Sequence, residues 1–144
     1  MYTHHIYQEI NEALRKGVLT PEQQNYVNVL NRALDKLNPE FLYVYRGVNN
    51  MPADVLQKYI DAFNNGTEVT EKHFTSSSIN LKTAEEYAGD GVLFYIKSKT
   101  VRNIMKLSKW GDEEGEMLFR SGTKFKVSRV EKVGVLHVIE MEEV

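Results

Sequence analysis

The stretch 111–119, GDEEGEMLF, places two carboxylates, Glu114 and Glu116, two residues apart and directly before an apolar run. If that run forms a β-strand, side chains two residues apart point to the same face of the sheet. Glu114 and Glu116 would then project together from the start of a strand, at the mouth of the cleft that this strand lines. Two carboxylates on one face repel each other, which costs stability unless the charge is used. The pair is therefore a candidate site, and its meaning depends on the motifs that precede it.

An arginine motif, Tyr45-Arg46-Gly47, ends the first run of aromatic and β-branched residues. The Arg46 guanidinium offers five N–H donors in a fork that suits a phosphate or diphosphate. Gly47, which has no side chain, would let a ligand approach the backbone closely. The simpler interpretation is an arginine at a strand end that pairs with a surface carboxylate. The motif alone leaves both open.

A serine motif, FTSSS at 74–78, stands at the end of a later candidate strand. Alternation would put Phe74, Ser76 and Ser78 on one face, with His73 on the face opposite to Ser76. A buried hydroxyl both donates and accepts, so Ser76 could hold a carboxylate in one rotamer. The alternative is a set of ordinary turn-forming serines. A nucleophilic serine is not expected, because the chain lacks a Gly-x-Ser-x-Gly elbow.

Helical periodicity occupies the first part of the chain, and short strands occupy the second, which predicts an α+β fold. Thr20, Pro21 and Gln23 predict the start of a helix with a capping box, and Thr83 with Glu86 predicts a second capping box. The expected helices cover about 6–14, 21–37 and 52–63, with a short one after Thr83. The expected strands cover about 41–46, 72–78, 92–97, 101–107, 115–119, 124–133 and 135–142.

Length and composition favour one ordinary domain. The 144 residues are 42% hydrophobic and 26% charged, with a net charge of -2, so nothing indicates nucleic-acid or membrane-surface binding. There is no cysteine, and the four histidines form no ligand-spaced pair, so we expect neither disulfides nor a metal site. No signal peptide or transmembrane segment is visible, which predicts a cytoplasmic protein. We expect a monomer.

In their order along the chain, the three motifs resemble those of the Arg-Ser-Glu class of ADP-ribosyltransferases. That class includes bacterial binary toxins, Rho-modifying exoenzymes and tailed-phage transferases, and it shows an aromatic-Arg, an aromatic-x-Ser-Thr-Ser and a Glu/Gln-x-Glu motif. The segments AEEYAG at 84–89 and EMLFRSGTKF at 116–125 also look like family sequence. The resemblance covers residue 41 to the C-terminus. This chain departs from the pattern at Ser77, which replaces threonine, and at Asp90, where some relatives carry a basic residue.

The resemblance implies one domain, 1–144, in which helices of the N-terminal part, 1–38, pack on a split antiparallel β-sandwich, 41–144, that binds NAD without a metal. Arg46 would bind the NAD diphosphate, and the Gly47 backbone would meet the nicotinamide carboxamide. Ser76 would hold Glu116, which would stabilise the oxocarbenium-like cation as nicotinamide leaves. Tyr87 would pack beside the nicotinamide.

The same resemblance assigns the acceptor to the segment before Glu116. Glu114 would orient the acceptor and take its proton, and Trp110 would lie on the acceptor-recognition loop. In this family Glu-x-Glu accompanies arginine acceptors, and a carboxylate suits a guanidinium. The expected reaction is mono-ADP-ribosylation of an arginine on a target protein, by a toxin-like phage or bacterial effector.

Other functions remain open from the sequence. Water could be the acceptor, which would make the protein an NAD glycohydrolase, or the acceptor could be a nucleic acid or a small molecule. A non-catalytic NAD-binding module would keep the fold without the reaction. The last alternative is an unrelated α+β domain whose motifs match by chance.

Overall fold

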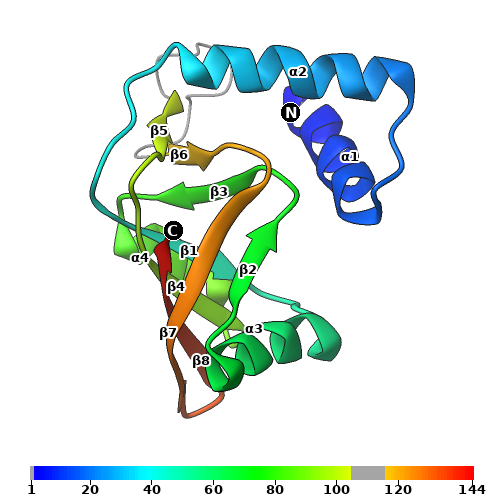
Figure 1. Cartoon of the computed structure of the whole chain (residues 1–144). Coiled ribbons are helices and arrows are strands. Elements are labelled where there is room, and N and C mark those ends of the chain that lie inside the picture. The colour runs from blue at the N-terminus through cyan, green and yellow to red at the C-terminus, as the bar shows by residue number, and fades with distance from the viewer. Residues whose placement is uncertain (1, 105–115) are drawn as a thin grey trace.

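The computed structural model describes residues 2–104 and 116–144. Helices come first and strands predominate later, so the predicted α+β class is confirmed (Figure 1). The helices are α1 (Tyr2–Lys16), α2 (Pro21–Asp35), α3 (Ala53–Asn65) and α4 (Leu81–Ala88). The strands are β1 (Tyr43–Val48), β2 (Glu68–Glu71), β3 (Thr75–Ser78), β4 (Val92–Lys97), β5 (Arg102–Asn103), β6 (Glu116–Phe119), β7 (Thr123–Val133) and β8 (Leu136–Glu143).

Hydrogen bonds join the described strands in the order β2-β7-β8-β4-β1-β3-β6-β5. All neighbours are antiparallel except β4 and β8, which are parallel, so the sheet is mostly antiparallel. β1 is paired along its whole length with β4 but meets β3 at a single pair, Tyr45 with Ser78. The sheet is therefore weakest between β1 and β3, which is where the arginine and serine motifs lie.

The two N-terminal helices cover the β3–β6 end of the sheet (Figure 1). The predicted capping box is confirmed, because the Thr20 hydroxyl accepts from Gln23 N and the Gln23 side chain accepts from Thr20 N. One apolar cluster joins these helices to the sheet: Ile10, Val27, Leu30, Leu34, Phe74, Ile104 and Leu118. This packing fixes the position of α1 and α2 over β3 and β6.

The larger core lies between α3 and the long strands. It includes Val44 of β1, Tyr59 of α3 and Phe94 of β4, and the Tyr59 and Phe94 rings meet edge to face at 5.1 Å. The shorter helix α4 packs on β1 through a separate small cluster that contains Ala84, Ala88 and Leu93. Alternate residues of β1 consequently face α3 and α4.

Three details of the expected secondary structure are wrong. The strand expected at 72–78 is shorter, because β3 begins at Thr75 after a bend at His73, and β2, at Glu68–Glu71, was not predicted. The short helix is not capped by Thr83, since Asn80 is its N-cap and accepts from Lys82 N and Thr83 N. β1 begins at Tyr43, two residues later than expected.

The strand expected at 101–107 is represented by β5, and everything from 105 to 115 lies outside the described residues. Among the residues described, no helix is long and apolar enough to cross a membrane.

Candidate functional site

The structure brings the arginine and serine motifs into direct contact. Arg46 Nη1 donates to the Ser76 carbonyl oxygen at 2.9 Å and to Ser76 Oγ at 3.0 Å. Both bonds use one nitrogen, so Nη2 and Nε of the fork can still meet a ligand. Arg46 and Ser76 are each half-buried, which leaves them accessible from the cleft. This fixed guanidinium is suited to bind a diphosphate.

Strand register places Glu116 beside the serines. In the antiparallel ladder of β3 and β6, Ser78 lies opposite Glu116, and Ser76 lies opposite Leu118. Opposite residues share a face, and alternate residues of one strand do too, so Ser76, Ser78 and Glu116 project on the same side. Ser76 is the diagonal neighbour of Glu116, at a distance that long side chains can span. Ser76 Oγ accepts from Arg46 and keeps its own hydrogen to donate, so its predicted bond to Glu116 stays a prediction that this register permits.

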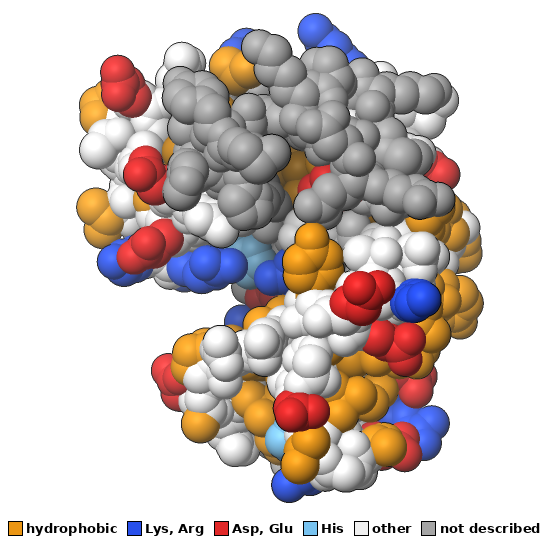
Figure 2. Space-filling view, turned by 180° about the vertical axis from the view of Figure 1, so that it is seen from behind, with side chains coloured by type: hydrophobic (Ala, Val, Ile, Leu, Met, Phe, Trp, Pro, Cys, Tyr) orange, Lys and Arg blue, Asp and Glu red, His pale blue; other side chains and the backbone are white. Residues whose placement is uncertain are grey.

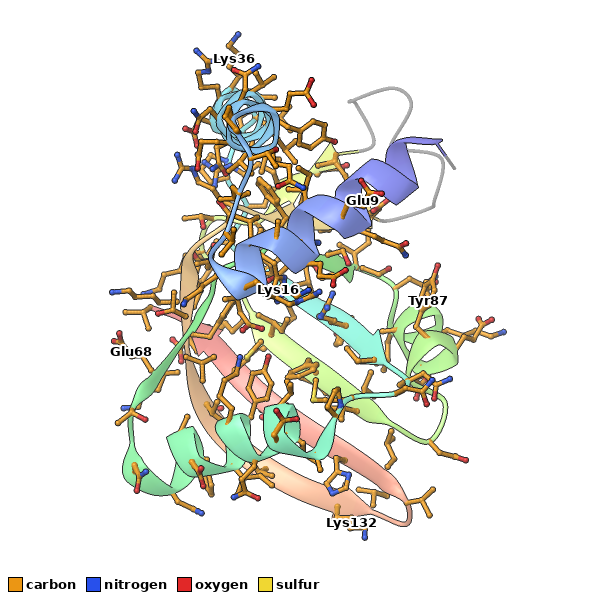
Figure 3. The ribbon with its side chains drawn as sticks, turned by 90° about the vertical axis from the view of Figure 1, so that its right-hand side faces the viewer. Glu9, Lys16, Lys36, Glu68, Tyr87 and Lys132 are labelled. Atoms are coloured by element: carbon orange, nitrogen blue, oxygen red, sulfur yellow. The ribbon has the colours of Figure 1, made fainter. Side chains whose placement is uncertain are left out.

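The glycine of the arginine motif is required by α4. A Cβ on Gly47 would lie 1.9 Å from the Ala84 carbonyl oxygen and 2.5 Å from Ala88 N. No side chain fits there, so a glycine is needed for β1 and α4 to pack, whatever else its backbone binds. The close packing also brings Tyr87 of α4 near the end of β1. Tyr87 is 55% exposed and projects from the edge of the molecule (Figure 3).

A buried polar cluster lies close to Arg46, and no sequence pattern predicts it. Glu71, at the end of β2, is 3% exposed and accepts from Tyr59 Oη at 2.5 Å and from Lys58 Nζ at 3.1 Å. His73 is 7% exposed, and its Nε2 lies 3.7 Å from Glu71 Oε2. The partners come from α3, ten or more residues away, so no local pattern could reveal the cluster.

Burial and charge set the protonation of this cluster. The pKa of His73 is lowered to about 4, chiefly by burial and also by the positive charges of Arg46 and Arg15, although the Glu71 carboxylate and the hydrogen bond to Phe74 oppose this. Burial would raise the pKa of Glu71, but its basic neighbours His73 and Lys58 and its hydrogen bonds from Tyr59 and Lys58 hold it below its usual value. Burial and the Glu71 charge raise the pKa of Tyr59. At neutral pH the cluster therefore holds a carboxylate, a neutral imidazole and a neutral phenol.

The surface is hollowed between the part of the molecule that carries α1 and the part that carries α3, and Lys or Arg side chains line the upper rim (Figure 2). Positive charge in a concave site attracts an anionic ligand. Of the predicted site residues, Arg46, Gly47, Ser76, Tyr87 and Glu116 are described.

The two residues predicted to handle the acceptor, Glu114 and Trp110, lie outside the described residues. In the part of the chain that the structure describes, no group of three or more His, Asp or Glu side chains could hold a metal ion.

Comparisons with known proteins identify the family of this chain. The family model for NAD:arginine ADP-ribosyltransferases matches residues 1–144. The Mav protein of Mycobacterium avium (strain 104), which is named as an NAD(+)–arginine ADP-ribosyltransferase, is 42% identical over 127 residues, or 88% of this chain. The chain spans 15% of the length of that relative.

Solved structures share the fold. Exoenzyme S from Pseudomonas aeruginosa superposes with a TM-score of 0.78 at 20% identity, over 99% of this chain and 70% of that one. The Vis toxin from Vibrio splendidus superposes with a TM-score of 0.75 at 25% identity, over 96% of this chain and 67% of that one. The chain therefore belongs to the NAD:arginine ADP-ribosyltransferase family.

Proposed function

We propose that this chain transfers ADP-ribose from NAD to the guanidino group of an arginine on a target protein and releases nicotinamide. The observation that carries the proposal is the Arg46–Ser76 contact, together with a register that puts Glu116 on the same face as Ser76. An anion-binding fork and a carboxylate on one side of the sheet are what the cleavage of NAD requires.

The dinucleotide would bind along the β1–β3 junction. Arg46 would bind the diphosphate with its remaining N–H groups, and the Gly47 backbone would meet the nicotinamide carboxamide. Tyr87 would pack against the nicotinamide ring from α4. The structure of exoenzyme S was solved with carba-NAD bound, which supports a dinucleotide in the same fold.

In the reaction, the bond between the ribose C1′ and the nicotinamide nitrogen breaks, and its electron pair leaves with nicotinamide. Glu116, held by Ser76, would stabilise the positive charge that develops on the ribose. A nitrogen of the acceptor guanidinium then forms the new bond to C1′, and its proton passes to Glu114. Trp110 would contribute to the surface that the acceptor meets.

The acceptor is expected to be an arginine. A structure of the Vis toxin was solved with agmatine, a small guanidine compound, which supports a guanidine acceptor in a related protein. A carboxylate at position 114 can pair with a guanidinium and draw off its proton, whereas an amide cannot remove a proton. NAD hydrolysis by water would be a side reaction of the same site.

The proposal is tested by incubating the protein with NAD labelled in its adenylate part and a cell lysate, and by measuring both labelled protein and free nicotinamide. Label should appear on protein, and Glu116→Gln should abolish both readouts. Glu114→Gln should abolish protein labelling while nicotinamide release continues. Glu68→Gln, an exposed carboxylate of β2, is the matched control and should change neither readout. Labelling that survives Glu116→Gln would overturn the assignment.

A further inference from the structure

Two buried side chains hydrogen-bond to the backbone of Phe74, two residues before Ser76. The Phe74 N–H donates to Asn11 Oδ1 at 2.9 Å. The Phe74 carbonyl accepts from Asn11 Nδ2 at 3.2 Å and lies 2.9 Å from His73 Nδ1. Asn11 and His73 are both buried. Three hydrogen bonds thus fix the backbone at the point where β3 begins.

The hydrogen of His73 can be assigned from this contact. A carbonyl oxygen only accepts, so Nδ1 must carry the hydrogen and donate. The other nitrogen, Nε2, is 3.7 Å from Glu71 Oε2, too far for a hydrogen bond, and that oxygen already accepts from Tyr59. The hydrogen bond that the imidazole makes is therefore the one to the Phe74 carbonyl oxygen.

The Phe74 backbone leads directly into the part of β3 that contacts Arg46. Phe74 is two residues before Ser76, and its ring is buried in the apolar cluster under α1 and α2. β3 meets β1 at one pair only, whereas its four residues are all paired with β6. The ladder to β6 supports Ser76, whose carbonyl and hydroxyl anchor Arg46. Asn11 of α1 and His73 extend this support to Phe74, the residue that precedes the ladder.

We propose that His73 is a positioning residue for dinucleotide binding, whose Nδ1–H fixes the Phe74 carbonyl and so keeps Ser76 against Arg46. This inference rests on the proposed function, because NAD is the ligand that Arg46 is taken to bind. His73 does not touch the dinucleotide in this account. Its effect reaches the ligand through the backbone of β3 and through Arg46.

Two amide substitutions at position 73 distinguish the effect of losing the Nδ1 donor from the effect of changing the side-chain volume. An asparagine side chain can place its N–H₂ where Nδ1 lies, whereas a glutamine side chain extends to the position of Nε2. His73→Asn should bind NAD within about twofold of the unaltered protein. His73→Gln should weaken NAD binding about tenfold, the effect of one lost hydrogen bond, with kcat for nicotinamide release unchanged.

The measurements are the Kd for NAD by calorimetry and the KM and kcat for nicotinamide release, with thermal unfolding to establish that each variant is folded. Asn11→Asp provides a second route to the same peptide, because it removes the Nδ2 donor and keeps the acceptor, and it should also raise KM without lowering kcat. His137→Gln, on β8, is the matched control and should change neither constant.

Equal Kd values for His73→Asn and His73→Gln would overturn the proposal, as would a fall in kcat at constant KM. These results differ from a failure of the proposed function. If the unaltered protein binds NAD without releasing nicotinamide, the transferase proposal fails, and the Kd values of the two variants still decide the role of His73. If the unaltered protein does not bind NAD, both proposals fail.

Discussion

Acidification should destabilise this protein through His73, well before its carboxylates are protonated. In the folded state the pKa of His73 is about 4, against an ordinary value of 6.5. Between these values the unfolded chain binds a proton that the folded protein does not bind. The free energy of unfolding must therefore fall as the pH falls from about 6.5 towards 4.

The size of the effect follows from the two pKa values. Integrating the proton uptake of one such group from pH 7 to pH 5 gives a loss of about 2 kcal/mol in the free energy of unfolding. The pKa of Glu71 is lowered, so the stability that Glu71 contributes is lost only as the pH falls below its ordinary value of 4.5. The interval from pH 7 to pH 5 thus isolates the histidine.

The assay is urea unfolding at pH 7 and pH 5, followed by circular dichroism, for the unaltered protein and for His73→Asn. The variant has no imidazole at this position. Its free energy of unfolding should therefore fall by about 2 kcal/mol less between pH 7 and pH 5 than that of the unaltered protein. His137→Asn is the matched control for the loss of one histidine and should keep the full acid destabilisation. Equal losses for the unaltered protein and His73→Asn would refute the reasoning.

Three further substitutions test contacts that stabilise the fold. Gly47→Ala should lower the free energy of unfolding by about 2 kcal/mol or more, because the new methyl group would lie 1.9 Å from an α4 carbonyl oxygen, and an unchanged melting temperature would contradict this. Glu143→Ala should cost about 2 kcal/mol in urea unfolding, since the buried carboxylate accepts from the amides of residues 99–100, and a cost below about 0.5 kcal/mol would show that these amides find other partners. Asp35→Ala should cost less than about 1 kcal/mol in the same assay, because its pair with Arg120 is exposed, and a larger cost would mean that the pair has a structural role.

The sequence predicted the parts of the fold that depend on neighbouring residues. Thr20 and Gln23 form the capping box that their spacing indicates, because both partners lie within one turn. The spacing also predicts Thr83 as the N-cap of α4, and this is wrong. Asn80 offers a side-chain oxygen one turn earlier, and the helix begins at Leu81. Spacing identifies candidate caps, and the backbone selects among them.

Long-range partners explain what the sequence did not predict. A glutamate such as Glu71 is ordinarily exposed to solvent. Here Tyr59 and Lys58 of α3 donate hydrogen bonds to its carboxylate, and these bonds allow it to be buried. Phe74, which follows the bend at His73, bonds to Asn11, 63 residues away, and no local pattern predicts such a partner. The motif order did predict that Arg46 and Ser76 belong to one site, because family resemblance carries three-dimensional information that periodicity lacks.

The most direct test of the central claim uses agmatine as a defined acceptor. The protein is incubated with NAD and agmatine, and the products are identified by mass spectrometry. The unaltered protein should yield ADP-ribosyl-agmatine and an equal amount of nicotinamide, and Glu116→Gln should yield neither product. Nicotinamide with ADP-ribose but no ADP-ribosyl-agmatine, or an active Glu116→Gln variant, would rule out the proposed transfer.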